Sequence, residues 1–169
     1  LLYAIHHFEE HIIFNFIEWK LKYFNHSAAA LSTEAILSIL VCVIVVFAFL
    51  HLVKNNRASA DVSLYILLAI QIINAVFHIF FSLYFNDFSP GVITSILVYL
   101  PGNYLIVRAA FQEGYLKSST EYGFIALLGT ATFILFEIYG PLVIVLSIIS
   151  SLLYFVWFNK RLVAKGQHT

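Results

Sequence analysis

Residues 34–53 read EAILSILVCVIVVFAFLHLV, a run of 20 residues that is apolar almost throughout. About 20 such residues form a helix long enough to cross the hydrocarbon core of a bilayer. Cys42, the single cysteine of the chain, lies inside this run. We expect it to pack as a small apolar side chain, because one cysteine forms no internal disulfide and no zinc–thiolate cluster. The stretch therefore predicts a transmembrane helix.

The composition of the whole chain has the same bias. Of 169 residues, 62% are hydrophobic and 11% are charged, whereas a soluble domain carries about a quarter charged residues. A domain of this size could not bury so much apolar surface in its own core. The net charge is zero, so nucleic acid is not an expected partner. We predict an integral membrane protein in contact with membrane lipids. Because the chain begins at Leu1 and has no methionine, we also expect it to be part of a longer polypeptide.

Short polar stretches divide the apolar sequence into segments. Turn residues occur at 86–91, and Gly140-Pro141 splits an apolar run that is too long for one span. Pro101 removes a backbone hydrogen bond and is expected to kink its helix. We predict an all-α, polytopic transmembrane helix bundle that forms a single transmembrane domain over residues 1–169. About six helical segments are expected, near residues 1–22, 34–53, 61–85, 91–112, 121–139 and 141–159.

The distribution of basic residues predicts an orientation. With six spans, one side of the membrane receives seven of the nine basic residues, namely Lys54, Arg57, Arg108, Lys117, Lys160, Arg161 and Lys165. The other side receives Lys20 and Lys22, which with Trp19 and Tyr23 resemble an interfacial anchor. Because loops rich in lysine and arginine stay in the cytoplasm, both termini are expected to be cytoplasmic.

Ionisable groups gather at the start of this apolar chain. Residues 6–11 read HHFEEH, which places five titratable side chains within six residues. On a helix, His6, Glu9 and Glu10 share one face at spacings of three and four residues. His7 and His11 form a second pair, about 100° around the same helix. Ionisable groups inside a membrane are costly and usually mark a functional site.

The third segment carries a matching polar pair. Asn74 and His78 are four residues apart, and His78 and Glu10 are expected at nearly the same depth in the bilayer. Side by side, the two helices would bring His6, Glu9, Glu10 and His78 together. Two imidazoles and two carboxylates suit a divalent metal such as zinc or iron. A metal-free hydrogen-bond network that joins the two helices is the alternative.

The order of these motifs resembles that of the HXXEE family, small bacterial membrane proteins named for their first motif. The HHFEE stretch at 6–10 supplies that motif, and His78 with Asn74 matches a later histidine. A Tyr-x-Pro-Gly motif of the family corresponds here to residues 88–91, FSPG, so phenylalanine stands in place of the tyrosine. Any role of the tyrosine hydroxyl would then fall to the nearby Tyr84. The resemblance covers residues 6–105 and implies a bacterial inner-membrane protein. The family has no established activity, so the resemblance implies a site and no reaction.

Three functions fit these residues. The leading hypothesis is a metal-dependent membrane hydrolase that acts on a lipid-like substrate. His6, Glu10 and His78 would hold the metal, and Glu9 or Glu10 would act in catalysis. Substrate contacts or supporting contacts are expected from Asn74, His7, His11 and Asn103. The alternatives are a transporter that uses the same groups as a proton or cation relay, and a non-catalytic interaction or lipid-binding module.

Overall fold

The computed structural model describes residues 2–24 and 33–164, and every regular element within these ranges is helical. The α-helices are α1 (Leu2–Phe8), α2 (Phe16–Tyr23), α3 (Thr33–Lys54), α4 (Arg57–Leu67), α5 (Ile73–Tyr84), α6 (Val92–Thr94), α7 (Leu100–Gln112), α8 (Ser119–Tyr139) and α9 (Leu142–Ala164). Three π-helical turns continue them, namely η1 (Glu9–Ile13), η2 (Leu68–Ile72) and η3 (Ser95–Tyr99). The expected all-α bundle is confirmed.

The membrane assignment is supported by length, composition and exposure. Five helices are long and apolar enough to cross a bilayer, at Leu37–Lys54, Arg57–Tyr84, Val92–Gln112, Ser119–Tyr139 and Leu142–Ala164. Large apolar side chains on them are exposed, among them Leu52, Leu127 and Leu153. Lipid tails are as apolar as leucine, so such an outer surface suits a bilayer. The chain is an integral membrane protein.

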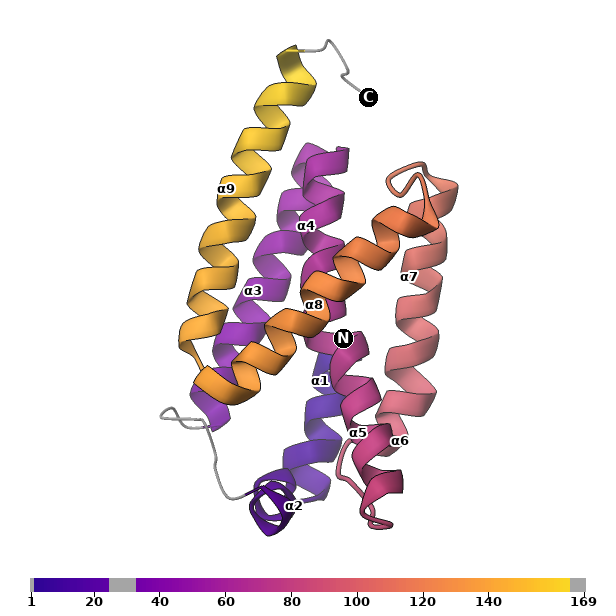
Figure 1. Cartoon of the computed structure of the whole chain (residues 1–169), viewed down its shortest axis with the longest axis vertical. Helices are drawn as coiled ribbons and strands as arrows, with labels where there is room; N and C mark the ends of the chain where they lie inside the picture. Colours follow the sequence, from indigo (N-terminus) through magenta and orange to yellow (C-terminus); the bar gives the residue numbers. More distant parts are fainter. Residues whose placement is uncertain (1, 25–32, 165–169) are drawn as a thin grey trace.

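A long central helix organises the bundle. It runs without interruption from Arg57 to Tyr84 as α4, η2 and α5, and α3, α7, α8 and α9 pack against it (Figure 1). Helix α8 crosses the central helix closely at Gly129. A Cβ added there would lie only 3.1 Å from the backbone nitrogen of Ala69. The lower half of this helix carries the two polar residues that were expected to face the first segment, Asn74 and His78.

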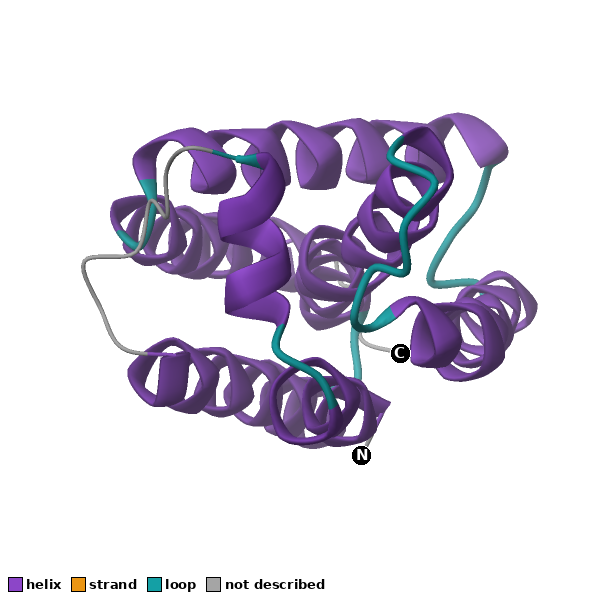
Figure 2. Cartoon of the chain, turned by 90° about the horizontal axis from the view of Figure 1, so that it is seen from below, coloured by secondary structure: helices purple, strands orange, loops and turns teal. Residues whose placement is uncertain are grey.

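The first segment differs from the prediction of one helix over residues 1–22. Helix α1 and turn η1 end at Ile13, Phe14 is extended, and α2 then runs in a new direction. Figure 1 shows α2 end-on and Figure 2 shows it from the side, so it lies across the bundle axis. The break follows from an N-cap, since the side chain of Asn15 accepts a hydrogen bond from the backbone N–H of Glu18. The Asn-x-x-Glu spacing is a helix-start pattern that the apolar content of the segment concealed.

Other boundaries also differ for local reasons. The third segment begins at Arg57 rather than at residue 61, because Asn56 and Ser59 form a capping box. Asp61 lies inside this helix and accepts a hydrogen bond from the hydroxyl of Tyr154.

The later segments also differ in detail. In the helix that contains Pro101, the π turn η3 comes just before the proline, and the helix continues past it as α7. Gly140 ends α8 as expected. Lys165, part of the charge argument, lies outside the described residues, and the membrane orientation stays a prediction.

The contacts that hold α2 in place predict a response to pH. Asp87 accepts hydrogen bonds from Lys22 Nζ at 2.8 Å and from the Tyr23 hydroxyl at 2.6 Å. The Lys22 ammonium, helped by Tyr23, holds the pKa of Asp87 below its ordinary value. The contact therefore stabilises α2 fully above the unfolded pKa of aspartate, about 3.9, and is lost as pH falls through the lowered folded-state pKa.

Acidification should consequently speed amide hydrogen exchange in residues 16–23 more than in α8, once exchange is corrected for its intrinsic pH dependence. Replacing Asp87 with asparagine should raise exchange in α2 at pH 7 and reduce the extra response to acid, leaving the part that comes from the Lys20–Glu137 pair. An unchanged acid response in this variant would show that Asp87 does not control the docking of α2.

Candidate metal centre

Three parts of the chain meet at one buried cluster. His6 on α1 and Glu10 on η1 come from the first segment, and His78 comes from α5. One ligand atom from each of the three lies within 4.8 Å of the other two. His6 and His78 are fully buried, and Glu10 is 7% exposed. The structure thus brings together the three residues that were predicted as metal ligands, including the depth-matched pair of Glu10 and His78.

The distances within the cluster are short enough for the three side chains to share a proton or a cation. Glu10 Oε1 lies 3.4 Å from His6 Nε2 and 2.8 Å from His78 Nε2. The shorter distance would permit a hydrogen bond, yet the ring nitrogen is not aligned for one, and His78 Nε2 has no hydrogen-bond partner among the described residues. Ligands on a tetrahedral ion with bonds of about 2.0–2.2 Å lie roughly 3.3 Å apart. The distance between His6 and Glu10 matches this separation, and that between His78 and Glu10 is shorter by about half an ångström.

Hydrogen bonds fix the orientation of His6. Its Nδ1 lies 2.7 Å from the hydroxyl oxygen of Thr94, and that hydroxyl donates to the carbonyl of Gly91. The network makes Nδ1 the protonated nitrogen and leaves the lone pair on Nε2. Asn74 Nδ2 donates to this Nε2 at 2.9 Å. The other ring N–H of a metal-bound histidine usually donates to a carboxylate, a backbone carbonyl or water, and the Thr94 hydroxyl takes that place here. Asn74 occupies its predicted place beside the cluster.

His78 is held in a similar way by the turn that follows α5. Its Nδ1 lies 3.0 Å from the hydroxyl of Ser89, which is itself fully buried. This contact directs Nε2 toward Glu10. Both imidazoles thus use Nδ1 for support and turn Nε2 toward the same carboxylate. Ser89 and Thr94 flank the Pro90-Gly91 turn and received no role from the sequence.

Gly91 packs directly against all three candidate ligands. Its φ of +99° is in the left-handed region that favours glycine. An added Cβ would lie 2.9 Å from His6 Cε1, 3.0 Å from Glu10 Cγ and 3.0 Å from His78 Cε1. The glycine of the FSPG stretch is therefore needed both for its backbone conformation and for the space that it leaves.

Glu9 occupies a different position from the one predicted for a catalytic carboxylate. Its Oε1 accepts the backbone N–H groups of Gly91 and Ile93, both at 3.1 Å, and its Oε2 accepts that of Thr94 at 2.7 Å. Three backbone hydrogen bonds hold the side chain in place. Glu9 thus joins η1 to the turn at residues 91–94, and it is outside the His6–Glu10–His78 group.

The second oxygen of Glu10 faces a different pair of histidines. Oε2 lies 3.8 Å from His7 Nδ1 and 3.8 Å from His11 Nε2. The two imidazole rings are adjacent, with centroids 4.3 Å apart. Both side chains are partly accessible, at 14% and 18%. Glu10 therefore stands between a closed histidine pair and a more accessible one.

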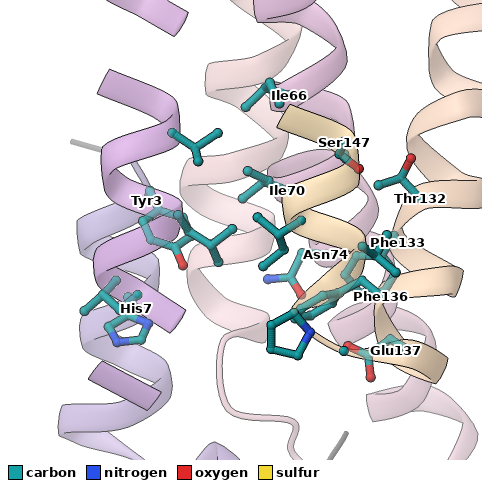
Figure 3. Close-up of a pocket in the computed structure, with 18 of the residues that line it drawn as sticks. Tyr3, His7, Ile66, Ile70, Asn74, Thr132, Phe133, Phe136, Glu137 and Ser147 are labelled. Carbon is teal, nitrogen blue, oxygen red and sulfur yellow. The ribbon is translucent and has the colours of Figure 1, made fainter. Parts of the chain in front are cut away.

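An apolar cavity of about 360 Å³ opens beside this accessible pair. Glu10, His7, His11, Tyr3 and Asn74 form its polar end, and the rest of the wall comes mainly from apolar side chains of α2, α3, α4, α8 and α9. Figure 3 shows Tyr3 and His7 on one side of the cavity, with Phe133 and Phe136 on the other.

An ion pair also lies on the cavity wall. Lys20 Nζ is 2.6 Å from Glu137 Oε2, and both residues line the cavity. The sequence predicts that Lys20 belongs to an interfacial anchor, and the structure pairs it with Glu137 on α8.

Each π turn lies next to a residue of the cluster. Turn η1 carries Glu10, η2 ends two residues before Asn74, and η3 ends at Tyr99. The Tyr99 ring stacks on His6 with centroids 4.2 Å apart, and it is fully buried. π turns of this kind are frequent at functional sites. Tyr99 was missed in the sequence, where it reads as one more aromatic residue of an apolar helix.

Asn103 and Tyr84 lie outside the His6–Glu10–His78 cluster. Asn103 does not line the cavity. Its Nδ2 donates to Gln71 Oε1 at 3.0 Å and to the Tyr99 carbonyl at 2.9 Å, so it stabilises the helix near Pro101. Tyr84 is 70% exposed, so it does not replace the hydroxyl that Phe88 lacks.

Comparisons with known proteins agree with the motif. Residues 1–106 match the family described as "Protein of unknown function with HXXEE motif". The matched region contains the candidate ligands and every residue that contacts them in the cluster. No curated protein and no solved structure matches the chain.

Proposed function

The chain belongs to the family of proteins of unknown function with the HXXEE motif, and from this premise we propose that it is a metal-dependent membrane hydrolase of lipid-like substrates. His6, Glu10 and His78 are the proposed ligands of a zinc or iron ion. Two histidines and one carboxylate form a known ligand set for both metals. The proposed setting is the bacterial inner membrane.

The observation that carries this proposal is the pairing of His78 Nε2 with Glu10 Oε1. The two atoms are 2.8 Å apart, buried, and not aligned for a hydrogen bond. Two lone pairs held so close in a dry interior need a proton or a cation between or beside them. A divalent cation supplies that charge, and the supporting contacts of Thr94 and Ser89 orient both imidazoles for it.

The cation would supply a nucleophile derived from water at neutral pH, and it would polarise a substrate oxygen. Glu9 is not the general base of this proposal, because its oxygens are engaged by three backbone N–H groups. Glu10 Oε2, His7 and His11 border the cavity, so groups able to accept a proton lie on the side where a substrate would enter. These residues replace Glu9 in the role that the sequence suggested.

The cavity supports a substrate with an apolar chain. Its volume of about 360 Å³ falls within the range of small-molecule sites, about 300–1,000 Å³. Its polar end is next to the candidate metal centre, while Phe133, Phe136 and Ile70 contribute apolar wall. A lipid chain would lie along that wall and present its ester or amide group to Glu10. The transporter and the non-catalytic module remain predictions from the sequence.

A hydrolysis assay tests the proposal. Protein that has been stripped with a chelator and reloaded with zinc or iron(II) should hydrolyse long-chain esters or amides, and the stripped protein should not. Ser147 lines the cavity from α9, so Ser147→Phe should fill part of it. We expect this variant to lose roughly tenfold or more of its activity on long-chain esters and much less on short-chain esters, since one or more methylene contacts are each worth about 1 kcal/mol.

Elemental analysis of the same samples separates an effect on metal binding from an effect on the cavity. Ser147→Phe should retain the metal content of the unchanged protein. Absence of hydrolysis across esters and amides in metal-loaded, folded protein would contradict the hydrolase proposal. Equal losses on long and short chains would contradict the assignment of the cavity.

A further inference from the structure

We propose that the centre binds two cations, with Glu10 as the bridge and with His7 and His11 holding the second ion. This inference rests on the proposed function, because it adds a position to the same metal centre. The two oxygens of Glu10 face different histidine pairs: Oε1 faces His6 and His78, and Oε2 faces His7 and His11. A carboxylate that divides its oxygens in this way is arranged as a bridging ligand.

The second triad has the spacing that a cation requires. His7 Nδ1 and His11 Nε2 are each 3.8 Å from Glu10 Oε2, and ligand atoms of the three residues lie within 4.8 Å of one another. An ion with bonds of about 2.0–2.2 Å can join atoms up to roughly 4 Å apart. Small side-chain rotations therefore suffice to close this triad around an ion.

The two positions differ in access. His6 and His78 are fully buried, whereas His7, Glu10 and His11 border the cavity. The inner ion would be held in a closed position, and the outer ion would have room for water or a substrate oxygen. Catalytic metal ions keep such an open position, and paired ions about 3.5–4 Å apart act on the attacking and leaving oxygens of one substrate.

The charge of the two ions sets their relative affinity. Two divalent cations carry more positive charge than Glu10 can neutralise, and Glu9 is already engaged by backbone N–H groups. The outer ion therefore needs an additional anion, such as hydroxide or an anionic headgroup. We expect it to bind more weakly than the inner ion. A lone pair of His7 or His11 that holds a cation cannot accept a proton at the same time. Metal binding therefore distinguishes the role of these histidines as ligands from their role as proton acceptors.

Zinc stoichiometry tests the inference. Untagged protein in detergent should bind about two zinc ions per chain at saturation, measured by elemental analysis after removal of free zinc. The double variant His7→Gln/His11→Gln should bind one zinc ion, and His51→Gln should still bind two. His51 is a matched control, because its Nδ1 contacts Ser59 at a site away from the cavity.

A second readout reports the bridge itself. With cobalt(II) in place of zinc, the unchanged protein should show the magnetic coupling of a carboxylate-bridged pair, and the double variant should show an isolated ion. Circular dichroism and size-exclusion chromatography would establish that each variant is folded.

The outcomes separate this inference from the proposed function. One zinc ion in the unchanged protein and an equal amount in the folded double variant would overturn the second position and leave the first intact. Loss of both ions in the folded double variant would also overturn the division into two triads. No zinc in the unchanged protein would overturn the proposed metal centre itself.

Discussion

Replacing Glu10 with alanine should remove the metal from the protein and abolish hydrolysis. Among the described residues, Glu10 is the only acidic member of the proposed centre, and its oxygens face His6, His7, His11 and His78. Loss of an outer supporting group typically costs 10–100-fold in metal affinity, so loss of this ligand should cost more than roughly 100-fold. Elemental analysis of the purified protein and calorimetric titration with zinc measure the change.

His78→Ala provides a second test of the same centre, because it removes one inner ligand and leaves Glu10 in place. It should strongly weaken the inner position. Glu113→Gln is the matched control, since it removes an exposed carboxylate at the end of α7 and should leave metal content unchanged. Metal content that is equal in Glu10→Ala, His78→Ala and the control would sink the ligand assignment.

The metal-free network makes a different prediction for these variants. If the cluster only joined α1 to α5, the unchanged protein would contain no metal after saturation and washing. Glu10→Ala would then act through stability alone, because removing one partner of a buried charged pair costs about 3–5 kcal/mol. Metal content therefore separates the two interpretations before any activity is measured.

The sequence predicted the elements with strong apolar patterns and the contacts that depend on depth. The run at residues 34–53 predicted a span because its length matches the bilayer, and α3 covers it. Glu10 and His78 were paired by counting residues from the expected membrane surface, and their side chains meet. Both inferences use one-dimensional quantities, namely length and depth, that a sequence contains directly.

Features that depend on long-range packing were not predictable in this way. Glu9 and Glu10 are adjacent and chemically alike, yet only the position of the 91–94 backbone turns Glu9 into a partner for three N–H groups. The break before α2 had a local signal at Asn15 and Glu18, but the surrounding apolar residues favoured one continuous span. The role of Gly91 depends on the three-dimensional approach of His6 and Glu10, which precede it by 85 and 81 positions in the chain.

Replacing Gly91 with alanine should both destabilise the protein and weaken metal binding. A residue other than glycine in the left-handed region costs about 1–2 kcal/mol. The added Cβ would also lie 2.9–3.0 Å from His6, Glu10 and His78. His6 and His78 are fully buried, so their rings cannot move away without disturbing Thr94, Ser89 or their other neighbours. We therefore expect at least a tenfold loss of metal affinity, measured by zinc titration, because ligand geometry must change.

Gly114→Ala separates backbone strain from the effect on the site. Gly114 also has a positive φ, +79°, but a Cβ added there would meet nothing within 4 Å. Both variants should thus lose stability in thermal unfolding, while only Gly91→Ala should lose metal affinity. Adding Thr94→Ser to Gly91→Ala should not restore zinc binding, because the added Cβ clashes with His6, Glu10 and His78 and not with Thr94. If Gly91→Ala binds zinc as tightly as Gly114→Ala, the three side chains that surround Gly91 do not form the metal centre, and the turn serves only to join η1 to the helix that follows.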